Sequence, residues 1–65
     1  MEIIVNGAPK QTDAATAGAL ASELGMKRGT VLIEHNGVAL RPDEWENTPL
    51  QNGDRIEMLK IVAGG

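Results

Sequence analysis

Apolar side chains recur at every second position in three stretches of this 65-residue chain, residues 1–5, 30–35 and 55–62. Successive side chains of a β-strand point to opposite faces, so this period of two predicts three strands, each with one apolar face. The residues predicted to share that face are Met1, Ile3 and Val5, then Val31 and Ile33, then Ile56 and Met58.

Asn-Gly pairs follow the first two of these strands, at residues 6–7 and 36–37. Asn-Gly is the strongest short-range signal of a two-residue hairpin turn, because both central positions need a positive φ. The pairs therefore predict return strands at about residues 8–12 and 38–41. Pro9 has no N–H to donate to a neighbouring strand, so we expect the first return strand at an edge of the sheet.

A period of 3.6 residues between the two hairpins predicts one helix. Its apolar stripe consists of Ala17, Leu20, Ala21 and Leu24. Thr16 is a typical N-cap residue, and Gly25 can end the helix in a left-handed conformation. Two helical turns are unstable alone, so the helix must pack on the sheet.

Residues 42–45 begin with Pro and predict a single helical turn, and residues 52–54 (Asn-Gly-Asp) predict another turn before the last strand. The order is then hairpin, helix, hairpin, crossing loop, strand. This order predicts an α+β fold of the ubiquitin-like β-grasp type, with one main helix across one face of a mixed four- or five-stranded sheet. We expect one domain over residues 1–62 and a flexible C-terminal tail over residues 63–65.

Composition excludes several function classes. The chain has no cysteine, one histidine and a formal net charge of −3. Disulfides, cysteine-based metal sites and a thiol nucleophile are absent, and an acidic chain is unlike the basic proteins that bind nucleic acid. No apolar run reaches the ~20 residues of a membrane span, and no signal peptide precedes the first strand. These features predict a cytoplasmic monomer that binds neither nucleic acid nor membrane.

Few side chains are candidates for chemistry. His35 ends a strand beside a turn, where a solvated surface role is expected. An acidic cluster (Asp43, Glu44, Glu46) is expected to cap the helical turn and not to bind a metal. Trp45 is expected to anchor the crossing loop on the core. No nucleophile–base pair, phosphate-binding loop or metal-ligand spacing is present, so we predict no catalytic residue and no metal site; the protein would be a substrate of enzymes.

The chain ends in Gly64-Gly65. A C-terminal carboxylate that is activated by another enzyme must enter that enzyme's active site and react with ATP to form an acyl-adenylate. Glycine has no Cβ, so such an end can pass a narrow channel and leaves the reacting carbonyl unhindered. The alternative is an ordinary frayed terminus.

Several blocks of the chain together closely resemble the ThiS family of thiamin-biosynthesis sulfur carriers. They are residues 1–7, Asn36-Gly37, residues 40–45, Leu50, residues 53–57 and residues 62–65. The resemblance covers nearly the full length, and the Pro-x-Glu-Trp block with Gly-Asp and the Gly-Gly end is more specific than Gly-Gly alone. It also places the last strand beside the first and parallel to it, which periodicity does not show.

The resemblance implies that Gly65 is the modified residue, with Ala63 and Gly64 as its flexible neighbours. A ThiF-like adenylyltransferase would activate Gly65 with ATP and magnesium, and no cofactor would be bound by the chain itself. A sulfur donor such as a cysteine desulfurase would then supply the sulfur of a thiocarboxylate. A ThiG-like thiazole synthase would receive it.

A partner-binding surface is predicted from a break in the last strand. Leu59 and Ile61 fall on the face opposite the predicted core face, beside an outward Ile4 if the first and last strands pair. Exposed apolar residues that gather on one face mark interaction sites, and ubiquitin-like proteins use this face for their activating enzymes. The alternative is a β-bulge that turns Leu59 inward and Lys60 outward.

Two other functions remain open from the sequence. The first is the small subunit of a molybdopterin synthase, which has the same fold and tail chemistry with another sulfur acceptor. The second is a ubiquitin-like interaction domain or protein modifier that never carries sulfur.

Overall fold

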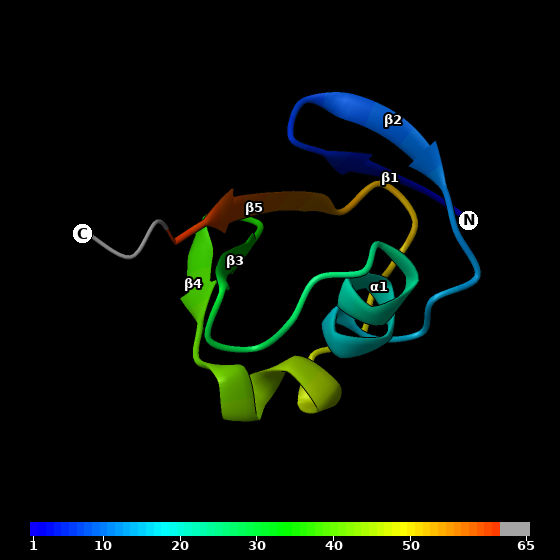
Figure 1. Ribbon diagram of the computed structural model, residues 1–65. Coiled ribbons are helices and arrows are strands. Elements are labelled where there is room, and N and C mark those ends of the chain that lie inside the picture. Colours follow the sequence, from blue (N-terminus) through cyan, green and yellow to red (C-terminus); the bar gives the residue numbers. More distant parts are fainter. Residues whose placement is uncertain (62–65) are drawn as a thin grey trace.

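A five-stranded mixed sheet carries the fold, and one helix crosses one of its faces (Figure 1). The computed structural model describes residues 1–61. Its elements are β1 (Glu2–Val5), β2 (Ala8–Gln11), α1 (Ala17–Glu23), β3 (Val31–His35), β4 (Val38–Leu40), the 3₁₀ helix η1 (Pro42–Asn47) and β5 (Arg55–Lys60). The strand order is β2-β1-β5-β3-β4, with β5 parallel to β1 and antiparallel to β3. The predicted α+β arrangement, including the placement of the last strand, is confirmed.

Both hairpin turns have the predicted geometry. Asn6 and Gly7 have φ values of 49° and 83°, and Asn36 and Gly37 have φ values of 50° and 86°. Two successive positive φ values define the turn type that matches the twist of paired strands, and only Asn-Gly and a few similar pairs adopt it at low cost. The Pro9-containing strand β2 lies at an edge of the sheet, as predicted.

Hydrogen bonds from the first hairpin turn hold β5 in the centre of the sheet. The Asn6 side chain accepts from the Met58 amide (2.7 Å) and donates to the Met58 carbonyl (3.2 Å). The Ile4 amide donates to the Asp54 carbonyl (2.8 Å), so the parallel pairing begins where β5 is entered. A turn residue therefore extends the β1–β5 pairing beyond the end of β1.

The helix α1 begins and ends as its sequence predicts. The Thr16 hydroxyl accepts a hydrogen bond from the Ala19 amide (3.1 Å). At the other end Gly25 has a φ of 72°, and the Met26 amide donates to the Ala21 carbonyl (2.8 Å), which is the Schellman pattern. These caps satisfy backbone groups that a two-turn helix cannot pair internally.

The core lies between α1 and the sheet. Its buried residues are Ile3, Ala14, Ala17, Leu20, Ala21, Val31, Ile33, Trp45, Leu50, Ile56 and Met58. Leu20 is fully buried among them, while Leu24 and Val5 pack against the cluster and stay partly exposed. The predicted packing of the helical stripe on β1, β3 and β5 is confirmed.

η1 closes the core from the side of α1. Its Trp45 is buried, as predicted for an anchor of the crossing loop, and the Arg28 guanidinium lies 5.1 Å from the centre of the Trp45 ring. The Glu44 carboxylate accepts from the Arg41 amide (2.7 Å) and caps the first turn. Glu46 instead pairs with Arg28 across the two elements (2.6 Å).

His35 differs from the expectation of a solvated surface residue. Its side chain is only 21% exposed, and its Nε2 lies 2.8 Å from Oδ2 of Asp54, 19 residues away. Asp54 also accepts from the Gln51 amide (2.9 Å) and from the Asn36 side chain (3.2 Å). Burial raises the pKa of Asp54, but its hydrogen bonds with His35, Gln51 and Asn36 outweigh burial, so the pKa lies below its usual value. The pairing of β3 with β5 brings these distant residues together.

The change Asp54→Asn should lower the free energy of unfolding by about 2 kcal/mol at pH 7, because it removes charge-assisted hydrogen bonds. The pKa of Asp54 is lower in the folded chain than in the unfolded chain. Its contribution is therefore complete above about pH 4 and is lost as pH falls through the folded pKa. Urea unfolding between neutral and acid pH should show a shallower acid loss for the variant than for the wild type. Asp43→Asn, at a side chain that is 75% exposed, is the control, and equal behaviour of the two variants would contradict this account.

Candidate functional site

The end of β5 leads into the C-terminal tail, where the candidate chemistry lies. The Ile61 amide donates to the Thr30 carbonyl (2.9 Å), so the last described residue is attached to the start of β3. Residues 62–65, and with them Ala63, Gly64 and Gly65, lie outside the described residues. The boundary of the domain at residue 62, and the role of Gly65, stay predictions. The described structure shows instead what surrounds Lys60 and Ile61, the residues just before the tail, which we call the root of the tail.

One side of this root is apolar. Leu59 is 54% exposed and lies directly opposite Leu32 of β3, which is also 54% exposed. Both alternate with buried residues, so they lie on the face of the sheet opposite α1. Ile61 lies one residue beyond β5, is 47% exposed and also lines the cleft described below, so it borders both sides of the strand end. We call Leu32, Leu59 and Ile61 the outer patch.

The alternative of a bulge at Leu59 is wrong. The β3–β5 register runs without interruption from Val31 opposite Lys60 to His35 opposite Ile56. Side chains therefore alternate between the two faces of the sheet up to the end of β5. Leu59 lies on the face opposite α1, and Lys60 lies on the face that α1 covers.

Ile4, which the sequence grouped with Leu59 and Ile61, lies elsewhere on the same face. It pairs with Arg55 at the beginning of β5 and with Pro9 of β2, and it is partly buried. Leu59 lies four positions after Arg55, which amounts to about 13 Å along a strand. The structure therefore does not bring Ile4 beside Leu59.

Leu32 takes the neighbouring position instead, and the sequence reasoning did not single it out. The available signal was its place between Val31 and Ile33, which the alternating pattern put on the core face. That signal shows an outward leucine but does not show its neighbour. The neighbour depends on the pairing and register of β3 with β5.

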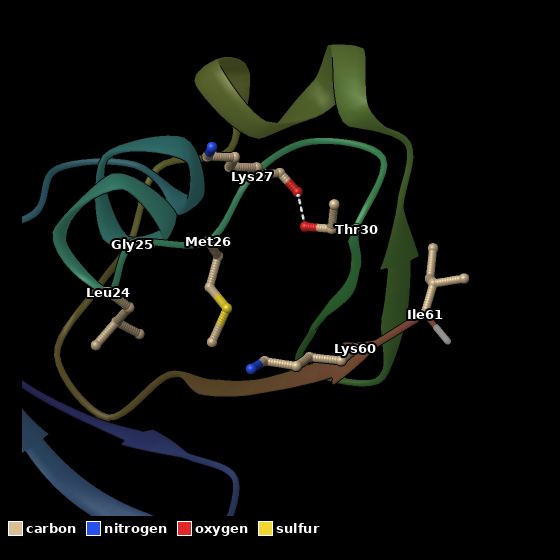
Figure 2. Close-up of a pocket in the computed structure, with 7 residues that line it drawn as sticks. All are labelled: Leu24, Gly25, Met26, Lys27, Thr30, Lys60 and Ile61. Atoms are coloured by element: carbon tan, nitrogen blue, oxygen red, sulfur yellow. Dashed lines mark hydrogen bonds between the residues drawn. The ribbon is translucent and has the colours of Figure 1, made fainter. Parts of the chain in front are cut away.

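A cleft of about 390 Å³ lies on the other side of β5, between its end and the C-terminal end of α1 (Figure 2). It is lined by Leu24, Gly25, Met26, Lys27, Thr30, Lys60 and Ile61. The side chains of Met26 and Lys60 approach each other across it, while the Lys27 amino group points away along the helix (Figure 2). The root of the tail thus has an apolar surface on one side and a cleft with a cation on the other.

Residues 1–61 contain no group of three His, Asp or Glu side chains that could hold a metal ion. Within the same residues, no helix has the length and apolar character needed to cross a membrane.

Comparison with known proteins decides the family. The model of the ThiS family matches residues 3–65. The chain belongs to the ThiS family. A crystal structure of a thiamine biosynthesis protein (ThiS) from Geobacter metallireducens has a TM-score of 0.82 and 32% sequence identity, with 100% of both chains covered. A solution structure of a thiamine biosynthesis protein from the same organism has a TM-score of 0.80 and 32% identity, with 100% of this chain and 88% of that chain covered. No curated protein matches the chain.

Membership of the ThiS family confirms the ubiquitin-like β-grasp fold. ThiS proteins are small sulfur carriers, not catalysts, so the family also supports a sulfur-carrier role.

Each of the changes Leu32→Glu and Leu59→Glu should alter the free energy of unfolding by less than about 1 kcal/mol, because both side chains are half exposed and lose only a cross-strand contact. Ile33→Ala should cost about 2–5 kcal/mol, because Ile33 is buried beneath α1. Urea unfolding of the three variants measures this contrast. If Leu59→Glu lowered the free energy of unfolding as much as Ile33→Ala, the outer patch would contribute to the stability of the fold and would not be a free surface.

Proposed function

We propose that this ThiS-family chain carries sulfur as a C-terminal thiocarboxylate and delivers it for the thiazole ring of thiamin. The observation that carries the proposal is the family match, which extends through the Gly-Gly end to residue 65. The similarity to solved thiamine biosynthesis proteins along the full length supports it. The other proposed functions have no comparable support.

The chemistry requires activation because a carboxylate is a poor electrophile. A Gly65 carboxylate oxygen attacks the α-phosphorus of ATP in a ThiF-like adenylyltransferase, with magnesium, and pyrophosphate leaves. The outer persulfide sulfur of a donor such as a cysteine desulfurase then displaces AMP from the acyl-adenylate, and a thiol reduces the acyl disulfide so formed to the thiocarboxylate. The resulting thiocarboxylate gives its sulfur to a ThiG-like thiazole synthase. In this scheme the enzymes supply the catalytic groups, and the chain supplies an unhindered glycine carboxylate.

The outer patch is the proposed docking surface for the adenylyltransferase. It lies on a sheet face without a helix, and its residues adjoin the root of the tail, where an enzyme that binds the tail must pass. Half-exposed leucines directly opposite each other on two paired strands offer apolar area that a partner can bury. We therefore assign the docking role to Leu32, Leu59 and Ile61 and not to Ile4.

Mass spectrometry of the protein isolated from its native host tests the function directly. A sulfur-for-oxygen exchange at Gly65 is the expected result. An isopeptide bond between Gly65 and lysines of other proteins would instead identify a protein modifier and overturn the proposal.

Removal of Gly64 and Gly65 should abolish adenylation and change the free energy of unfolding by less than about 0.5 kcal/mol, the scale for exposed sites. A carboxylate that enters another protein's active site cannot also be packed in its own core. Pyrophosphate release with a ThiF-type enzyme and thermal unfolding measure the two effects. Adenylation that survives the truncation, or a large loss of stability, would contradict the prediction.

Leu59→Glu and Leu32→Glu should each weaken binding to the adenylyltransferase by more than about 1 kcal/mol, the scale of an interface hot spot. Val38→Glu is the matched control, because Val38 is also an exposed apolar residue (63%) but lies on β4, opposite His35 and away from the outer patch. Calorimetric titration gives the affinities, and thermal melts check the fold. Equal affinities for the Leu59 and Val38 variants would exclude the outer patch as the docking surface.

A further inference from the structure

The cleft beside the tail has a chemical character different from that of the outer patch. Lys60 ends β5 on the side of the helix, opposite the buried Val31. Its amino group extends beneath Met26 and toward Leu24, so an ammonium group adjoins an apolar surface (Figure 2). A ligand that fits this surface combines a negative charge with apolar atoms.

The basic side chains that line this cleft differ from most others in the chain in having no carboxylate partner within residues 1–61. Three of the basic side chains lie in ion pairs, Lys10 with Glu23 (3.3 Å), Arg28 with Glu46 (2.6 Å) and Arg41 with Asp43 (3.3 Å). Within residues 1–61, neither Lys27 nor Lys60 has such a partner, and both line the cleft. Within the part of the chain that the structure describes, a protein with a net charge of −3 thus has two cations without a carboxylate partner in the lining of this cleft.

We propose that this cleft is a second docking point for the adenylyltransferase, in which Lys60 binds a carboxylate side chain of that enzyme. The inference rests on the proposed function. An enzyme that encloses the tail meets both sides of the end of β5, where the outer patch offers apolar contact and the cleft offers a cation. The two contacts together would set the direction in which the tail enters the enzyme. Contacts on opposite faces of β5 prevent the carrier from rotating about the axis of that strand.

Charge complementarity supports a partner's carboxylate as the occupant. Opposite charges across an interface speed the encounter and select the orientation, and salt weakens this effect. Lys27 also lines the cleft, but its amino group points away along the helix (Figure 2), so it adds only to the positive field, and Lys60 makes the direct contact.

The experiment compares Lys60→Glu with Arg55→Glu. Arg55 occupies the other end of β5, is exposed, and has no side-chain ion pair within residues 1–61, so both variants carry the same change of charge on the same strand. Pyrophosphate release by a ThiF-type enzyme is measured against the concentration of the carrier at low and high salt. Lys60→Glu should raise the KM for the carrier about tenfold at low salt and leave kcat unchanged within about twofold. Arg55→Glu should change both by less than about twofold.

Two further measurements make the test selective. The neutral variant Lys60→Gln should raise the KM by less than Lys60→Glu, and the differences should shrink at about 0.5 M salt, where charges are screened within a few ångströms. Thermal melts should show all variants folded, because both side chains are exposed.

The outcomes separate this inference from the function on which it rests. A KM for Lys60→Glu equal to that for Arg55→Glu, or a salt-independent effect, would overturn the second docking point while the wild type is still adenylated. A lower KM for Lys60→Glu would also overturn it and would indicate that the cleft holds a competing group, such as the chain's own C-terminal carboxylate. A wild-type chain that is not adenylated at all would overturn the proposed function and this inference with it.

Discussion

The insertion of β5 between β1 and β3 is the interaction on which the rest of the structure depends. β5 lies between the β1–β2 hairpin and the β3–β4 hairpin and pairs with both. The Asn6–Met58 hydrogen bonds link residues 52 positions apart. Such contacts form only after a long loop has closed, which costs chain entropy before any contact is gained. The chain has no disulfide to offset that cost, so the buried side chains of β5 and the hydrogen bonds of its two neighbours must do so.

The central position of β5 also gives the tail its surroundings. An edge strand would have one neighbour, whereas β5 has β1 at its beginning and β3 from Ile56 to Lys60. Its final residues therefore project from the middle of the sheet, with an apolar face on one side and the end of α1 on the other. The described end of β5 therefore has two chemically different sides.

The polar network around Asp54 holds the other end of the same strand. Asp54 joins the β3–β4 turn to the entry of β5, since His35, Asn36 and the Gln51 amide all bond to its carboxylate. The two ends of β5 thus have different surroundings. The beginning is fixed by partly buried polar contacts, whereas Leu59 and Lys60 at the end are exposed.

The sequence by itself determined the features that depend only on residues close together along the chain, namely turns, helix ends and the facing of strand residues. Asn-Gly set both turns, Pro9 placed β2 at an edge, Thr16 and Gly25 bounded α1, and the alternating pattern showed which way Leu59 points. The tertiary structure alone decided which outward residues meet. Leu32 lies opposite Leu59, Ile4 of β1 pairs with Arg55, four positions before Leu59, and His35 is paired with Asp54. The physical reason is register: local turn and helix signals act within a few residues, but contacts between strands far apart in sequence depend on how those strands align.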